Sequence, residues 1–380
     1  MSFDISNTYE FLRRNAPQVT KEEDVLFNKY CNSLYYKANK MGILSKCELC
    51  GKKIVGKANS HSIPQSILKN IEVSDRYYYP ITYALNNNIY YGPIGRKNRY
   101  GLNNTGTFHM LCEECENRVF KDYEQDSFIF NLSKGDKELL SSKILAKIWL
   151  KSALRKKFIS VFTKNFSMLI NEENVTLNYS LNEEYDDNSP IDILSPTPFE
   201  LDILELEHYV AKCKNIINGK EDDEFSLYYF DILDYPSSFA CQTLLPIQKS
   251  LNNITINDVY NYDSNYQIAL SLFTIFPTKT KTICFACCLK KEVKRIEPYI
   301  NYLNSLNLTA RRKLFQSTLF LYSDEVYTNK EKIDELVQDQ ISLNYISKKK
   351  KKKIFGSVEP MLLKPKLMAP YKFRKARFLL

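Results

Sequence analysis

Apolar residues recur at three- and four-residue intervals in several segments of the chain, and this spacing predicts helices there. The first of these segments opens with Thr20 and Glu23, the spacing of a helix-start capping box. Residues 65–71 are short enough to be either a helix or a turn. The predicted longer helices span residues 20–45, 112–130, 138–160, 200–218 and 294–345.

Other segments have the apolar runs and the flanking Pro, Asn and Lys that are typical of strands. These are "FSLYYFDIL", "YQIALSLFTIFP" and "KTKTICFACCLKK", all in the second half of the chain. Nearer the N-terminus, residues 46–64 predict a short hairpin that leads into a strand ending near Pro64. Residues 72–107 have no steady period and predict a loop or an irregular insertion. Helices and strands that alternate in this way predict an α+β fold.

The charges divide the chain into three regions. Residues 1–160 hold 25 Lys or Arg and 16 Asp or Glu, a net charge of +9. Residues 161–347 hold 16 Lys or Arg and 27 Asp or Glu, a net charge of −11. Residues 348–380 hold 12 Lys or Arg and 1 Asp or Glu, a net charge of +11. A basic region suits a phosphate backbone, although lysines also serve solubility alone.

The changes in net charge between regions, together with a length of 380 residues, predict more than one domain. We predict an N-terminal domain over residues 1–160 and an acidic linker over residues 161–199. An α+β domain for sensing or for binding a protein partner is expected over residues 200–347, followed by a basic tail over residues 348–380.

Membrane insertion and secretion are not expected from the sequence. It has no run of eighteen apolar residues, and its N-terminus lacks a basic stretch followed by an apolar one. We therefore expect a cytoplasmic protein without a membrane span. Disulfides are rare in the cytoplasm, where closely spaced cysteines more often bind a metal or act in redox chemistry.

Two Cys-x-x-Cys pairs are the most informative pattern in the chain. Cys47 and Cys50 form the first pair, and Cys112 and Cys115 form the second, 61 residues further on. Four thiolates of this kind bind zinc tetrahedrally, so the sequence predicts one zinc ion. Because cysteines fill all four positions, this zinc would be structural.

Side chains near the cysteine pairs are the candidates for chemistry. His61 lies between the pairs, and His109 comes just before the second pair. Glu116, Asp122 and Glu124 follow the second pair on a predicted helix. Glu116 and Glu124 are about two turns apart, so both can face one cleft. The alternatives are a hydrogen-bonded turn histidine for His61 and solvated acids on the helix surface.

The segments "CELCG", "NSHSIPQSIL" and "FHMLCEECENRVF" together resemble the HNH endonuclease family in its four-cysteine form. This resemblance covers about residues 45–128. It implies a zinc-stabilised ββα-metal, treble-clef-like nuclease domain with flanking helices in the N-terminal region. Members of the similar sub-group occur in bacterial anti-phage defence, which the resemblance suggests for this chain as well.

The resemblance also implies roles for individual residues. His61 would be the general base, and Mg²⁺ or Mn²⁺ would bind at Glu116, with Glu124 and His109 as further ligands. Two positions depart from the family pattern. Ser60 stands where many members have an aspartate or histidine ligand, and Glu116 stands where many have histidine. These departures leave open a binding-only domain.

The resulting functional hypothesis is a metal-dependent endonuclease that hydrolyses DNA phosphodiester bonds. Arg96, Lys97 and Arg99 lie in a basic loop with tyrosines that can contact nucleic acid, or that is only solvated. The alternatives are a non-catalytic zinc module that binds nucleic acid and a regulatory subunit that binds a partner through residues 200–347. A third pair, Cys284 and Cys287, is expected inside a strand.

Overall fold

A computed structural model of the chain gives the fold and most of the predicted site. The residues it describes are 33–34, 36–54, 59–72, 77–80, 100–172, 197–221, 224–250, 254–259, 261, 263, 265–323, 325–329 and 331–332. Three predicted features therefore lie wholly or mostly outside the described residues. They are the basic loop with Arg96, Lys97 and Arg99, the start of the helix at 20–45, and the tail 348–380.

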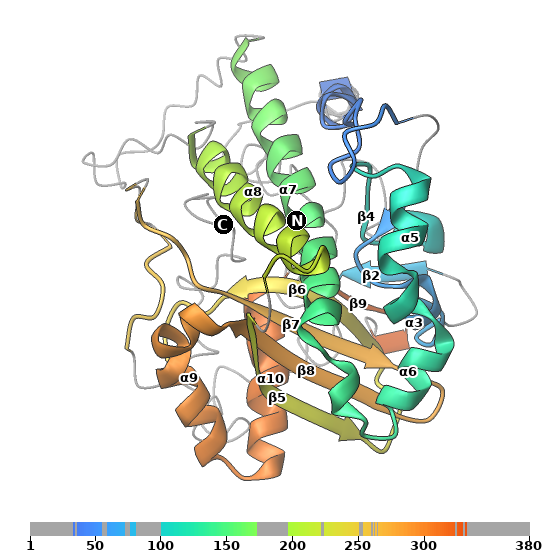
Figure 1. Cartoon of the computed structure of the whole chain (residues 1–380), viewed down its shortest axis with the longest axis vertical. Coiled ribbons are helices and arrows are strands. Elements are labelled where there is room, and N and C mark those ends of the chain that lie inside the picture. The colour runs from blue at the N-terminus through green and yellow to red at the C-terminus, as the bar shows by residue number, and fades with distance from the viewer. Residues whose placement is uncertain are drawn as a thin grey trace, which may run out of the picture.

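A seven-stranded sheet forms the centre of the molecule (Figure 1). Its order is β3-β2-β9-β6-β7-β8-β5, and all neighbouring strands are antiparallel. The strands are β2 (Tyr77–Pro80), β3 (Tyr100–Gly101), β5 (Phe225–Leu233), β6 (Phe239–Pro246), β7 (Leu270–Pro277), β8 (Thr282–Leu289) and β9 (Val326–Thr328).

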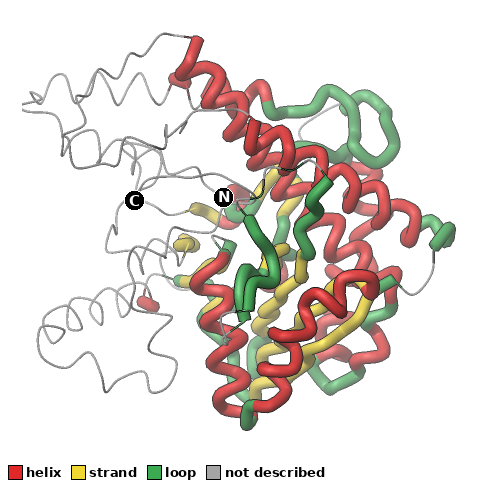
Figure 2. The backbone as a smooth tube through the Cα atoms, turned by 90° about the vertical axis from the view of Figure 1, so that its left-hand side faces the viewer, coloured by secondary structure: helices red, strands yellow, loops and turns green. Residues whose placement is uncertain are grey.

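Helices cover both faces of the sheet, as the view from the side shows (Figure 2). Leu272 of β7 faces the cluster that includes residues of α7 (Ser142–Glu172) and α8 (Thr197–Ile217). The next residue, Phe273, faces the cluster that includes α9 (Val293–Ser305) and α10 (Leu308–Tyr322). Successive side chains of a strand point to opposite faces, so every residue of β7 is buried. This double burial explains the continuous apolar runs in the sequence.

The helix α7 joins the N-terminal region to the sheet. It packs against α8 and β6 on one side and against two elements of the cysteine-bearing region, α5 (Glu113–Glu124) and β4 (Thr107–Phe108), on the other. The predicted boundary at residue 160 falls inside this helix, and residues 161–172, expected as the start of a linker, continue it. The two regions also share the sheet, because β2 pairs with β9.

The cysteine-bearing region is built around a second, two-stranded sheet. In it β1 (Ser60–His61) pairs with β4 in antiparallel register, so that His61 lies opposite Thr107. The short helix α3 (Gln65–Lys69) follows β1, and α5 follows β4. α6 (Asp126–Leu132) and the 3-10 turns η1 (Leu102–Asn104), η2 (Lys137–Leu139) and η3 (Lys290–Glu292) complete the described elements.

The mixed α+β class predicted from the sequence is confirmed. The strands 225–233, 270–277 and 282–289 and the helix 197–217 lie where the pattern placed them. Cys284 and Cys287 lie inside β8, as expected. The helix predicted over 294–345 is wrong in part, because α9 and α10 are followed by β9. The strands β2 and β6 were not predicted.

Within the described part of the chain, no helix has the combination of length and apolarity that crossing a membrane requires. The 31-residue α7 is long enough, but lysines interrupt its apolar sequence.

Candidate metal centre and the adjoining polar site

A tight turn presents the first cysteine pair. The backbone N–H of Gly51 donates to the carbonyl of Cys47 at 2.9 Å, and the N–H of Cys47 donates to the carbonyl of Lys52 at 2.8 Å. Gly51 has a φ of +70°, a conformation that side chains with a Cβ disfavour. This explains why a glycine follows the second cysteine directly.

The second pair lies at the start of α5. Cys112 is the residue that precedes the first turn of the helix, and Cys115 lies within that turn. Backbone N–H groups at a helix start are not used inside the helix, and they stabilise negative charge there. This effect acts to lower the pKa of Cys112, but burial outweighs it and the pKa of Cys112 is raised.

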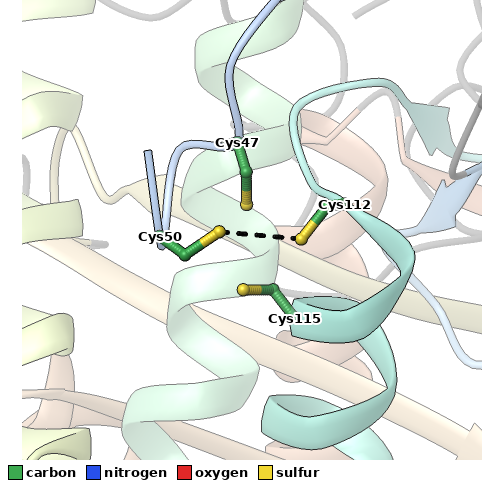
Figure 3. Close-up of side chains that lie close together, drawn as sticks. All are labelled: Cys47, Cys50, Cys112 and Cys115. Atoms are coloured by element: carbon green, nitrogen blue, oxygen red, sulfur yellow. Dashed lines mark hydrogen bonds between the residues drawn. The ribbon is translucent and has the colours of Figure 1, made fainter. Parts of the chain in front are cut away.

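The four sulfurs meet at one point, and Figure 3 shows them directed toward one another from the turn and the helix start. All four Sγ atoms lie within 4.8 Å of each other, and Cys50 Sγ is 3.7 Å from Cys112 Sγ. With Zn–S bonds of about 2.3 Å, tetrahedral geometry places two sulfurs about 3.8 Å apart. The four cysteines, all free thiols, thus fit a structural zinc ion.

The sulfurs also influence one another electrostatically. Burial raises the pKa of the Cys115 thiol, and the neighbouring sulfurs raise it further. Burial acts in the same direction on Cys47, but backbone N–H groups of Cys112, Cys50 and Leu49 outweigh it and lower its pKa to about 7. Four adjacent thiolates repel each other, so a dication at their centre would stabilise the cluster.

The first cysteine turn is anchored to three other elements through Glu48. Its backbone N–H donates to the carbonyl of Met110 at 2.9 Å, beside the second pair. Its carboxylate lies 3.1 Å from Lys157 Nζ of α7, and its carbonyl accepts from Lys214 Nζ of α8 at 2.9 Å. The cysteine cluster is therefore fixed to α7 and α8, the two helices that cover one face of the sheet.

His61 lies on β1, buried between that strand and η1. Its Nε2 is 3.0 Å from the carbonyl oxygen of Leu102 and 3.0 Å from the amide nitrogen of Gln65. Burial lowers the pKa of His61 below its usual 6.5, and the nearby charge of Lys151 acts in the same direction. The imidazole is therefore neutral at pH 7.

Glu116 and Glu124 face one cation, the ammonium group of Lys151 from α7. Lys151 Nζ lies 2.6 Å from Glu116 Oε1 and also contacts Glu124 Oε1. The second oxygen of Glu116 accepts from Ser60 Oγ at 2.8 Å. Burial acts to lower the pKa of Lys151, but the two carboxylates outweigh it and raise that pKa, so the ammonium stays charged.

The other predicted ligand, His109, and the candidate Asp122 lie elsewhere. The ring of His109 packs edge-on against Phe158 of α7, with 6.0 Å between the ring centroids. Asp122 pairs with Lys147, one helical turn before Lys151. Among the described residues, the four cysteines are the only set of three or more Cys, His, Asp or Glu close enough to hold a metal ion. The predicted Mg²⁺ or Mn²⁺ ligands do not form such a set.

The residues that the sequence reasoning missed are five of the basic ones of α7. These five form ion pairs inside the molecule, with α5, with Glu325 before β9, or with the first cysteine turn and α8. They are Lys147, Lys151, Arg155, Lys156 and Lys157. Their spacing on an otherwise apolar helix was the available signal, since a buried lysine needs a carboxylate partner.

Comparisons with known proteins add no relative. No protein-family model, curated protein or solved structure matches this chain. Function is therefore inferred from the geometry of these residues.

Proposed function

We propose that this protein is an HNH-like endonuclease that hydrolyses DNA phosphodiester bonds and carries one structural zinc ion. The observation that supports this most is that the strand carrying His61 is bonded, through Ser60, to Glu116 of α5. His61 and Glu116 come from a strand and a helix that are 55 positions apart, and Ser60, next to His61, bonds to Glu116. The cysteine cluster lies at the start of the same helix.

In this proposal His61 accepts a proton from water. Nε2 contacts both the carbonyl of Leu102 and the amide nitrogen of Gln65, and one of the two ring nitrogens of the neutral imidazole carries the lone pair that accepts the proton. The water oxygen would bond to phosphorus as its proton passes to the imidazole. The bond from phosphorus to the leaving oxygen would break, and that oxygen would keep the electron pair and take a proton from solvent. A buried, oriented and neutral imidazole suits this role.

Zinc would hold this arrangement without taking part in the reaction. Cys47, Cys50, Cys112 and Cys115 would be its ligands, and no coordination position remains for substrate. Its contribution is the relative position of α5 and the first cysteine turn.

A plasmid assay tests the proposal. Zinc-loaded protein should convert supercoiled plasmid to nicked or linear DNA, and His61→Ala should slow this by about 10²–10⁴-fold, the usual contribution of a general base. The control is His208→Ala, because His208 is exposed on α8. Equal inactivity of wild type and His61→Ala, with Mg²⁺, with Mn²⁺ and with neither, would refute the proposal.

A non-catalytic zinc module that binds nucleic acid is the second candidate. The observation that favours it is the pairing of Glu116 and Glu124 with Lys151, which leaves the acids without the role that the family resemblance implies. It predicts that wild type and His61→Ala bind labelled DNA equally well and that neither cleaves it. Fluorescence anisotropy at several salt concentrations would measure this binding.

A further inference from the structure

The position that the family resemblance assigns to a divalent cation already contains a positive charge. Residues 60 and 116 are the two positions at which the family has metal ligands, and here Ser60 Oγ donates to Glu116 Oε2 at 2.8 Å. The other oxygen of Glu116 lies 2.6 Å from Lys151 Nζ. Both oxygens of this carboxylate are therefore occupied by donors from the protein.

Glu124 completes the arrangement. Its Oε1 contacts the same ammonium, so one cation is shared by two carboxylates. The Lys151 side chain is only 1% exposed, whereas those of Glu116 and Glu124 are 19% and 26% exposed. The ammonium also lies 4.8 Å from the centroid of the Phe120 ring, a favourable place for a cation.

Mg²⁺ does not fit these residues as they stand. It needs oxygen ligands at about 2.0–2.1 Å in octahedral geometry. A dication bound to Glu116 and Glu124 would lie beside a buried ammonium that depends on the same oxygens. Lys151 cannot easily withdraw, because its neighbours Ile148 and Leu150 are fully buried in the core. Entry of the ion would leave the ammonium buried without a partner.

We propose that Lys151 is a built-in cation that replaces the divalent ion of this site, so that the site works without Mg²⁺ or Mn²⁺. The reaction part of this inference rests on the proposed function, whereas the ion-binding part does not. Lys151 acts as a positioning residue: it holds Glu116 against Ser60 and places a positive charge next to His61.

Binding of Mn²⁺ to the zinc-loaded protein tests the inference without any assay of activity. Wild type should show no Mn²⁺ binding at this site. Lys151→Met should bind one Mn²⁺ per chain, with an affinity at least about tenfold above the upper limit measured for wild type, since the competing charge is gone. Electron paramagnetic resonance of free Mn²⁺ measures both. Lys147→Met is the control, because Lys147 is also a buried lysine of α7 but pairs with one carboxylate, Asp122.

The outcomes divide clearly. Mn²⁺ bound by wild type and lost in Glu116→Gln would overturn the inference, and so would a folded Lys151→Met that binds no Mn²⁺. If Lys151→Met does not fold, Lys151→Gln takes its place in the same Mn²⁺-binding measurement. Glutamine keeps a hydrogen-bond donor for one of the two carboxylates but carries no charge. A gain of Mn²⁺ binding in Lys151→Met alone supports the inference.

Cleavage of plasmid by the same samples separates this inference from the proposed function. Wild type freed of all ions except zinc should cleave DNA as fast as with Mn²⁺. Cleavage that requires Mn²⁺ bound at Glu116 would support the nuclease and overturn the role of Lys151. Absence of both cleavage and Mn²⁺ binding in wild type, with Mn²⁺ binding gained in Lys151→Met, would support the role of Lys151 and overturn the nuclease.

Discussion

Replacing Glu325 by glutamine tests how the cysteine-bearing region is joined to the sheet. Glu325 precedes β9, and its side chain is fully buried. Its oxygens lie 3.0 Å from Arg155 Nε and 3.7 Å from Lys156 Nζ, and Thr243 Oγ1 donates to it at 3.2 Å. Arg155 in turn donates to the carbonyl of Thr107, the residue paired with His61. One carboxylate thus links the sheet, α7 and the strand opposite the proposed base.

The size of the effect follows from burial. Arg155 and Lys156 are 14% and 9% exposed, so water compensates little for the loss of the carboxylate. Breaking a buried ion pair at one partner costs about 3–5 kcal/mol, and we expect about 3 kcal/mol because glutamine keeps one acceptor. Glu200→Gln is the matched control: its pair with Lys164 is 47% and 30% exposed and should contribute below about 1 kcal/mol.

Urea unfolding followed by the fluorescence of Trp149 measures both variants. Trp149 is the only tryptophan of the chain, and its ring lies on α7, 5.9 Å from Tyr209 and 5.3 Å from Phe225. Hydrogen exchange at residues 59–68 should also accelerate in Glu325→Gln, since β4 loses part of its support. The reasoning is refuted if Glu325→Gln lowers the free energy of unfolding no more than Glu200→Gln does.

Three further predictions concern the metal centre, His61 and a turn glycine. Elemental analysis should find one zinc per chain, and Cys50→Ser should reduce the zinc content. Cys213→Ala is the control, because Cys213 lies in α8, and it should leave the zinc content unchanged. Equal zinc in both variants would contradict the assignment of the four cysteines to a zinc site. Burial lowers the pKa of His61, so the unfolded chain takes up the proton first as the pH falls below about 6.5. The contribution of neutral His61 to stability is therefore complete above that pH and decreases below it, and unfolding at pH 5 and pH 7.5 should show a smaller difference in His61→Asn than in wild type. Gly106 has a φ of +64°, and an added Cβ would lie 2.6 Å from Ser62 Oγ. Gly106→Ala should therefore lower the melting temperature and reduce the free energy of unfolding by more than about 1 kcal/mol. Gly101→Ala should have a smaller effect, because no atom lies within 4 Å of an added Cβ there.

Local patterns predicted part of this molecule well. The runs at 270–277 and 282–289 are strands because residues buried on both faces leave a continuous apolar signal, and the run at 225–233, at the edge of the sheet, was recognised although most of its residues are only half-buried. The two Cys-x-x-Cys pairs indicated a shared metal centre, because their spacing suits thiolate coordination, and their sulfurs do meet.

Pairings between distant residues were decided only by the tertiary structure. β9 has three residues, too few to show a period, and it exists because β2 and β6 bond to its two edges. The net positive charge of residues 1–160 suited a phosphate backbone, yet Lys147, Lys151, Arg155, Lys156 and Lys157 of α7 meet carboxylates from other elements. Arg155 and its partner Glu325 are 170 residues apart. Hydrophobic periodicity is a property of neighbours along the chain, whereas an ion pair depends on which helix faces which strand. The sequence therefore determined many of the elements and the four-cysteine cluster, and the tertiary structure decided that Lys151 pairs with Glu116 and Glu124.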